Sequence, residues 1–290
     1  MKNKHSRRSL LAGSAAGAGG LLAAGAFPGF AIAQPAAPEV AAPLPVPPWD
    51  AVPVCTPSNT DRAGQGPFFI HNDERAGDID LFRQNIRGQY DPRAEAGTEL
   101  QMHFRVLDNS GSAACADNPL AGVEVYVWHC DAQGYYSGFG EPGEQTPDEP
   151  YRFRPNHNDL DNDASFCRGA GVTDANGVVS FSTEFPGWYN GRDIHIHLMI
   201  LKPGTASRGR VRYRGEGHLY TTQLYFEPAL IDQVHKAAQP YLRRTTHPAY
   251  AGVILGDERG NSGLRMKAWV EAERVVAQMQ LVLDATQSAS

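Results

Sequence analysis

One short stretch of the chain, PGWYNGRDIHIH at residues 186–197, combines side chains that can bind a metal ion or move protons. His195 and His197 are separated by one residue, so on a β-strand both imidazoles project from the same face, with Cα atoms roughly 6.5–7 Å apart. Two imidazoles at that spacing can close onto one metal ion. Tyr189 and Arg192 lie just upstream and add a phenol and a fixed positive charge. The stretch predicts either a metal site or a strand with two hydrogen-bonded surface histidines.

The elements that must position these residues are predicted to be short β-strands. In DIHIHLMI at 193–200, apolar residues alternate with the two histidines, so one face of the strand is apolar. Strand patterns of the same kind occur in ELQMHFRV at 99–106, GVEVYVW at 122–128, TDANGVVSFST at 173–183, LYTTQLYF at 219–226 and AQMQLVLD at 277–284. Helix is predicted for residues 228–238 and for part of 264–276. Many short strands joined by long polar loops predict a mainly β fold, a sandwich of two mixed or antiparallel sheets with few short helices.

The first 33 residues are interpreted as an export signal. The pair Arg7-Arg8 precedes an apolar, small-residue run that ends in AIA at 31–33, an A-x-A type of cleavage site. Glycines and Pro28 interrupt the run, which disfavours a transmembrane anchor. We therefore expect export by the twin-arginine route, cleavage after this motif and a periplasmic or extracellular location. Because twin-arginine substrates cross the membrane already folded, the signal also favours a protein that carries a cofactor.

The composition of the remaining chain limits its partners and its domain count. The signal holds four of the 26 basic residues and none of the 32 acidic ones, so the mature chain has a net charge of −10. Nucleic acid is therefore an unfavourable partner. Residues 34–53 contain seven prolines and predict an extended linker or an arm along the surface. Residues 54–290 are long enough to form one β-sandwich domain.

Four cysteines follow the signal: Cys55, Cys115, Cys130 and Cys167. An even number in an exported chain, without a C-x-x-C spacing, favours two disulfides over a zinc cluster. The segment from Cys115 to Cys130 looks like a loop folded back on the next strand. This favours Cys115–Cys130 together with Cys55–Cys167, and the other two connectivities remain open.

Several motifs together resemble those of the intradiol ring-cleavage dioxygenases, the family that includes the catechol and protocatechuate dioxygenases. The motifs are GPFF at 66–69, RAGDIDL at 75–81, GVEVYVWHCDAQGYY at 122–136, FCRGAGVTDANGVVSFST at 166–183, PGWYNGRDIHIH at 186–197 and TTQLYF at 221–226. They occur in the family's order and cover about residues 55–235. This combination is far more specific than an isolated H-x-H pair.

The resemblance implies a site for one Fe(III) ion per chain with four protein ligands: Tyr136, Tyr189, His195 and His197. Two phenolates and two imidazoles form a hard donor set, which favours Fe(III) over Fe(II) and differs from the thiolate or all-histidine sets typical of zinc or copper. The implied reaction cleaves a catechol ring with O2 between the two hydroxyl-bearing carbons and yields a muconate-type diacid. The implied partners are a small aromatic diol and O2.

The resemblance also assigns roles around the metal. It implies that Tyr189 leaves the metal when substrate binds and then acts as a base. Arg192 would stabilise negative charge on the ring, and Gln223 would lie beside the site. Two residues, Asn190 and Gly191, separate Tyr189 from Arg192, fewer than in the better-known catechol and protocatechuate enzymes. A shorter pocket wall follows, and the identity of the ring substrate stays open.

Two other classes of function are compatible with parts of the sequence. A non-catalytic, transthyretin-like binding module would use strands such as GVEVYVW, but it does not account for two tyrosines and two histidines in the family's order. A zinc or copper enzyme would combine His195 and His197 with a further ligand such as Asp193. Colour separates these classes, because a ferric tyrosinate protein is red-brown.

Overall fold

A computed structural model describes residues 43–55, 64–70, 81–87, 97–110, 118–139, 164–189, 192–202, 217–239, 241 and 264–287. These residues all belong to a compact unit that spans residues 41–290. The predicted signal with Arg7 and Arg8 lies outside the described residues, as does Cys115. None of the helices in the described ranges is long and apolar enough to cross a membrane.

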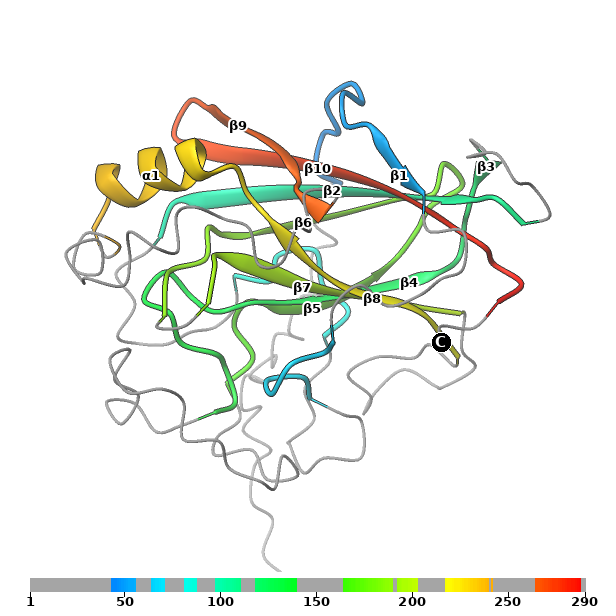
Figure 1. Cartoon of the computed structure of the whole chain (residues 1–290), viewed down its shortest axis with the longest axis horizontal. Coiled ribbons are helices and arrows are strands. Elements are labelled where there is room, and N and C mark those ends of the chain that lie inside the picture. The colour runs from blue at the N-terminus through cyan, green and yellow to red at the C-terminus, as the bar shows by residue number, and fades with distance from the viewer. Residues whose placement is uncertain are drawn as a thin grey trace, which may run out of the picture. The chain divides into compact units, whose positions relative to one another are not determined.

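Ten strands and one helix make up the regular structure of the described residues. They are β1 (Pro53–Cys55), β2 (Glu99–Asp108), β3 (Asn118–Pro119), β4 (Glu124–Trp128), β5 (Arg168–Val172), β6 (Val178–Glu184), β7 (His195–Leu201), β8 (His218–Tyr225), α1 (Pro228–Ala237), β9 (Lys267–Glu271) and β10 (Arg274–Leu283). The strands form two sheets that lie one above the other, with α1 at one end (Figure 1).

The two sheets differ in the direction of their strands. The six-stranded sheet has the order β1-β10-β2-β3, with β6 also paired to β2 and β9 to β10. Strand β10 is parallel to both β1 and β2, while the other pairs in this sheet are antiparallel. The four-stranded sheet has the order β5-β4-β7-β8 and is antiparallel throughout. The predicted mainly β sandwich is confirmed.

Alternate residues of the facing strands form the core between the sheets. Ile196 and Leu198 of β7 point into it, as do Phe104 of β2 and Phe181 of β6. The rings of Phe104 and Phe181 lie 6.1 Å apart, and all four side chains are fully buried. Burial of each side chain of this size stabilises the fold by about 1.5–3 kcal/mol. The apolar face predicted for residues 193–200 therefore faces the opposite sheet.

The outer face of the four-stranded sheet is buried as well. Tyr126 and Trp128 of β4 and Met199 of β7 belong to a second apolar cluster, which also contains Phe69 from the segment 64–70. Phe69 packs edge-on against Tyr126 and Trp128, at ring centroid distances of 5.6 and 5.0 Å. We call these residues and their neighbours the outer cluster. It covers the face of β7 that carries the two histidines.

The end of the proline-rich segment lies along β10. The side-chain amide of Gln278 donates hydrogen bonds to the carbonyl oxygens of Pro47 and Pro48, at 3.2 and 3.0 Å. Its Oε1 atom accepts a hydrogen bond from the backbone N–H of Asp50 at 3.1 Å. Strand β1 then continues along β10 in parallel register. These contacts attach residues 47–55 to the edge of the six-stranded sheet.

The predicted helix at residues 228–238 is confirmed as α1, but the helix predicted within residues 264–276 is wrong. This segment forms β9 and the start of β10, joined by a turn at Ala272 with φ of 54°. Its Ala, Glu and Arg residues favour helix locally. Pairing of β10 with β2 over ten positions buries Val275 and Val276 and outweighs that local preference.

Both favoured disulfide pairings are wrong, because Cys130 and Cys167 are buried free thiols. The Cys130 side chain turns into the outer cluster, where its thiol donates to the carbonyl oxygen of Gly187 at 3.3 Å. Burial raises the pKa of both thiols well above the usual value, so they stay protonated. Sequence spacing could not show this, since it carries no information on the direction in which the strand end after β4 turns its side chains.

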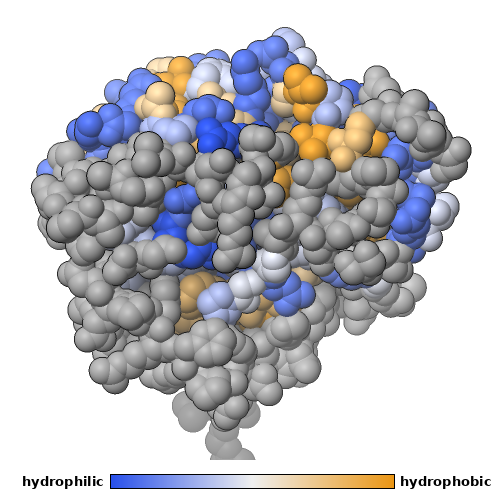
Figure 2. Space-filling model, in the orientation of Figure 1, coloured by the Kyte–Doolittle hydropathy of each residue, from blue (hydrophilic) through white to orange (hydrophobic). Residues whose placement is uncertain are grey.

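Exposed apolar side chains are scattered over the described surface. In the view of Figure 2, hydrophilic side chains dominate the visible coloured surface, with hydrophobic ones between them. Four large hydrophobic residues of the described ranges are exposed: Val46, Val52, Val172 and Val270. Scattered exposed apolar residues of this kind are normal on a protein surface and do not mark a binding site.

Candidate metal centre

His195 and His197 lie on β7, between β4 and β8, and point into the outer cluster. Their side chains are 2% and 1% exposed, and their Nε2 atoms are 3.1 Å apart. The Nδ1 atom of His195 lies 2.6 Å from the backbone carbonyl oxygen of Asp193. Because a carbonyl oxygen accepts, Nδ1 carries the proton and Nε2 presents its lone pair. The strand predicted for this stretch therefore directs two ring nitrogens to one point.

Two tyrosines bring their hydroxyl groups to the same point. The hydroxyl oxygens of Tyr136 and Tyr189 each lie 3.3 Å from Nε2 of His195. The two phenol rings are almost fully buried and pack edge-on, with centroids 5.9 Å apart. Tyr136 comes from the loop after β4 and Tyr189 from the loop after β6. Two oxygen and two nitrogen donors thus meet from three separate segments.

The dimensions and the charge of this donor set fit a metal ion. Donor atoms bound about 2 Å from a shared ion lie roughly 3 Å from one another, as the three distances to Nε2 of His195 do. Burial holds the pKa of His197 well below its usual value, and the neighbouring charges of His195 and Arg192 add to this effect. A neutral imidazole is the form that binds a metal ion. The four side chains can therefore hold one ion with two phenolate and two imidazole ligands.

The two tyrosine-bearing loops are locked together through glycines. The backbone N–H of Gly187 donates to the carbonyl oxygen of Asp131 at 2.9 Å. A Cβ atom at Gly187 would lie 2.2 Å from the carbonyl oxygen of Ala132. Gly134 has a φ of 94°, and a Cβ there would lie 2.4 Å from the carbonyl oxygen of Trp188. The loops can approach this closely because neither position carries a side chain.

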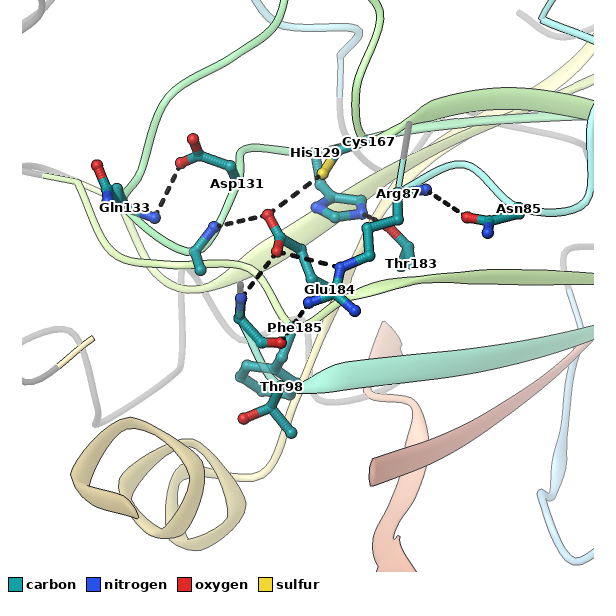
Figure 3. A network of polar contacts seen from close by, with 12 residues as sticks. Asn85, Arg87, Thr98, His129, Asp131, Gln133, Cys167, Thr183, Glu184 and Phe185 are labelled. Atoms are coloured by element: carbon teal, nitrogen blue, oxygen red, sulfur yellow. Dashed lines mark hydrogen bonds and ion pairs between the residues drawn. The ribbon is translucent and has the colours of Figure 1, made fainter. Parts of the chain in front are cut away.

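A buried carboxylate supports the same loops, as Figure 3 shows. Glu184, the last residue of β6, accepts hydrogen bonds from the backbone N–H groups of Ala132 at 3.2 Å and Gly97 at 3.0 Å. The Nε atom of Arg87 lies 3.7 Å from Oε2, the oxygen that also accepts from Gly97. Burial raises the pKa of Glu184, while the two N–H groups and Arg87 oppose that rise. Glu184 thereby ties the end of β6 to the loop that carries Tyr136.

Arg192 and Gln223 meet beside the histidines. Gln223 of β8 is paired with His197 of β7, so the two side chains share a face of the sheet. The Oε1 atom of Gln223 accepts hydrogen bonds from Nη2 of Arg192 and from the hydroxyl of Tyr225, the latter at 3.2 Å. Its Nε2 atom donates to the carbonyl oxygen of Gly64 at 3.2 Å. The structure thus brings all six predicted site residues together.

Three further residues pack against the four donors. The sequence motifs alone predict no role for them. Phe68 stacks on the ring of Tyr136, with centroids 4.3 Å apart and planes inclined by 13°. Trp128 stacks on His197 at 4.8 Å and 7°. The guanidinium of Arg168 lies 6.0 Å from the ring centroid of Tyr136. All three lie within the quoted motifs, but motif position carries no information on which ring each one touches.

A zinc or copper site built on the histidine pair is not favoured. Within the part of the chain that the structure describes, no group of three or more His, Cys, Asp or Glu side chains could hold a metal ion. His129 is committed elsewhere, with Nδ1 2.7 Å from the carbonyl oxygen of Cys130 and Nε2 3.0 Å from Oγ1 of Thr183. Tyrosines supply the remaining donors near His195.

Comparison with known proteins points to one class. The chain has the fold of an intradiol ring-cleavage dioxygenase from Tetranychus urticae, with a TM-score of 0.54 and 24% identity over 79% of this chain and 96% of that one. It is also 27% identical over 150 residues to a catechol 1,2-dioxygenase from Pseudomonas sp. (strain EST1001). That match covers 50% of this chain and 43% of the relative, so the chain spans less than half the relative's length. No family model matches the chain. The resemblance to intradiol dioxygenases is confirmed.

Proposed function

We propose that the protein is a non-haem Fe(III) dioxygenase that cleaves a catechol-type ring between its two hydroxyl-bearing carbons. The convergence of two phenols and two imidazoles on one buried point carries this proposal. Two anionic oxygens and two neutral nitrogens form a hard, electron-rich donor set that suits a ferric ion. The similarity to a catechol 1,2-dioxygenase supports the same reaction class.

Tyr136, Tyr189, His195 and His197 would hold the ferric ion, which would supply a Lewis acid for the diol and make the aromatic ring reactive toward O2. The phenolate oxygen of Tyr189 takes a proton from the substrate and becomes a neutral hydroxyl. The guanidinium of Arg192, held by Gln223, stabilises negative charge that develops on the ring. Phe68 and Trp128 keep water from the faces of the ligand rings on which they stack.

A direct test is metal analysis and oxygen uptake on the purified mature protein. We expect one iron ion per chain, a red-brown colour and O2 consumption with at least one member of a panel of catechols that includes hydroxyquinol and protocatechuate. The product should be a muconate-type diacid that contains both atoms of O2. A semialdehyde that is yellow at alkaline pH would show cleavage outside the diol. Iron-free protein without O2 uptake across the panel would refute the proposal.

Variants of the donor set test the assignment of each residue. Tyr136→Phe should lose much of the iron or of the visible band. Tyr189→Phe should keep iron and still bind catechol but turn over slowly, because its base is missing. Arg192→Ala should keep the colour and lose rate on the order of 10²-fold. Full iron and unchanged colour in both Tyr136→Phe and His195→Ala would contradict the ligand assignment.

A further inference from the structure

Arg168, the first residue of β5, carries a fully buried charge. Its side chain is 0% exposed, and among the described residues no carboxylate forms an ion pair with it. Its Nε atom donates to Oγ of Ser137 and its Nη2 atom to the carbonyl oxygen of Ser137, both at 2.9 Å. Its Nη1 atom has no hydrogen-bond partner among the described residues. A buried guanidinium is costly unless negative charge lies nearby.

The fold holds this charge against Tyr136. Ser137 directly follows Tyr136 and is itself anchored, because its hydroxyl donates to the carbonyl oxygen of Phe166 at 2.6 Å. The guanidinium carbon lies 6.0 Å from the centroid of the Tyr136 ring. Since Arg168 binds the backbone after Tyr136 while the phenol hydroxyl faces His195, the cation lies on the backbone side of the ring and the donor oxygen on the other.

Glu184, one of the buried carboxylates of the described residues, is engaged by other groups. Glu184 accepts hydrogen bonds from Gly97 and Ala132 and lies 3.7 Å from Arg87. Its negative charge is therefore already balanced by Arg87 and by the N–H groups of Gly97 and Ala132. The guanidinium lies 5.5 Å from the ring centroid of Phe139 and 6.0 Å from that of Tyr136, and of these two rings only that of Tyr136 can carry a negative charge.

We propose that Arg168 is a positioning residue for Tyr136: it clamps the backbone after this ligand and places a positive charge beside its ring that offsets the phenolate. The inference rests on the proposed function, because Tyr136 carries a full negative charge when it binds the metal ion. It goes further in assigning a role to a buried charge that forms no ion pair with a carboxylate of the described residues. Arg168 acts through Tyr136 and does not touch the substrate.

The colour of the iron-loaded protein reports this charge. A phenolate-to-iron band moves an electron from the tyrosine ring to the metal. A positive charge nearer to the ring than to the metal stabilises the donor electrons more than the acceptor, by Coulomb's law. Removing that charge should therefore lower the energy of the transition and shift the band to longer wavelength.

Three variants of the full mature chain test the proposal by visible spectroscopy. Arg168→Met removes the charge and keeps similar length, and its band should shift to longer wavelength. Arg168→Lys keeps the charge, and its band should stay close to that of the wild type. Arg105→Met is the matched control. Arg105 lies on β2 of the six-stranded sheet, away from the site, where it donates to Oε1 of Gln280 at 3.3 Å. The band of this control variant should not move.

Iron affinity and thermal unfolding separate the proposed role from a structural one. Iron affinity of Arg168→Met, measured by competition with a chelator, should fall on the order of 10- to 100-fold, the usual effect of removing a residue that orients a ligand. The metal-free variant should melt close to the wild-type temperature, because the loss of a costly buried charge offsets the loss of the hydrogen bonds to Ser137.

Each outcome decides between the two proposals. If Arg168→Met has its band at the wild-type wavelength and binds iron with wild-type affinity, the proposed role of Arg168 is overturned and the proposed function stays intact. Equal spectral changes in the Met and Lys variants, together with a lower melting temperature of both metal-free proteins, show a purely structural arginine and also overturn it. A wild-type protein that binds no iron with a phenolate band overturns the proposed function itself.

Discussion

At the scale of single residues, Gln223 links the charged group of the site to the segment that covers it. Its Oε1 atom accepts from Arg192 and Tyr225, and its Nε2 atom donates to the carbonyl oxygen of Gly64. An amide bonded at both ends has one preferred orientation. The guanidinium of Arg192 is therefore presented to the site from a fixed support.

Replacing Tyr225 by Phe removes one of the two donors to Oε1 of Gln223. A hydrogen bond of this kind contributes about 1 kcal/mol, so we expect kcat to fall roughly fivefold. KM, iron content and colour should change little, because Arg192 acts on the reacting ring. Steady-state oxygen uptake with catechol measures both constants. Tyr220→Phe, on the same strand but in the core between the sheets, is the control, and an equal loss there would contradict the role of Tyr225.

At the scale of elements, the loop after β6 holds Tyr189 on a fixed backbone. The hydroxyl of Tyr241 donates to the carbonyl oxygen of Phe185 at 2.8 Å. Nε2 of His235 on α1 lies 3.0 Å from the carbonyl oxygen of Pro186. Because these bonds satisfy the backbone just before Tyr189, we expect any displacement of that ligand to occur by rotation of its side chain.

The close contact of the two loops makes Gly187 sensitive to one added methyl group. In Gly187→Ala, the new Cβ would meet the carbonyl oxygen of Ala132 at 2.2 Å, so the loops must separate. Overpacking of this kind costs about 1–3 kcal/mol, and we expect lower stability and loss of iron. Urea unfolding and metal analysis measure the two effects. Gly64→Ala is the matched control, since a Cβ there meets nothing within 4 Å. Similar losses in both variants would argue against the locked loops.

At the scale of the whole molecule, buried histidines make stability depend on pH. His129 and His235 are fully buried, and burial lowers the pKa of each to about 4. In the unfolded chain a histidine titrates near 6.5, so unfolding between these values takes up protons. Their contribution is complete above about pH 6.5 and is lost as the pH falls toward 4. Glu184 has a raised pKa, so its contribution has the opposite sign and is lost as the pH rises.

We predict that the free energy of unfolding falls between pH 7 and pH 5, with about 2 kcal/mol from each of these two histidines. His235→Gln keeps a donor for the carbonyl oxygen of Pro186 and removes one titrating group. Its stability should therefore fall about 2 kcal/mol less over the same range. Urea denaturation at both pH values measures the difference. If the free energy of unfolding of this variant falls between pH 7 and pH 5 as much as that of the wild type, the contribution of His235 is disproved.

The cysteines are predicted to behave as two separate classes. Cys130 and Cys167 are buried thiols, whereas Cys55 is not a free thiol, which leaves Cys115 as its possible partner within the chain. Mass spectrometry after alkylation should find no modified cysteine in the native protein, two after unfolding and four after unfolding and reduction. Four modified cysteines without a reductant would exclude a Cys55–Cys115 disulfide.

The proposed export concerns the whole precursor and can be tested in cells. Replacing both Arg7 and Arg8 by Lys should keep the precursor in the cytoplasm, because the twin-arginine route requires the arginine pair. The exported wild-type protein should begin at Gln34. Export of the doubly substituted precursor at wild-type levels would show that another route is used.

Local pattern by itself predicted most strands, and the family resemblance implied the six predicted site residues. A period of two places His195 and His197 on one face of a strand whatever surrounds it, and the family motifs mark Tyr136 and Tyr189. Local information was insufficient in residues 264–276, where helix-forming residues became strands because pairing with β2 across the chain stabilises them more.

Tertiary structure alone decided which distant residues meet. The contact of Gly134 with Trp188, the clamp of Arg168 on Ser137 and the support of Gln223 by Gly64 each join segments that are remote in sequence. The free thiols follow the same rule, because a disulfide requires two sulfur atoms at bonding distance and spacing along the chain does not set that distance. Periodicity is a property of neighbours, whereas the shape and charge of the site come from contacts that exist only after the sheets have packed.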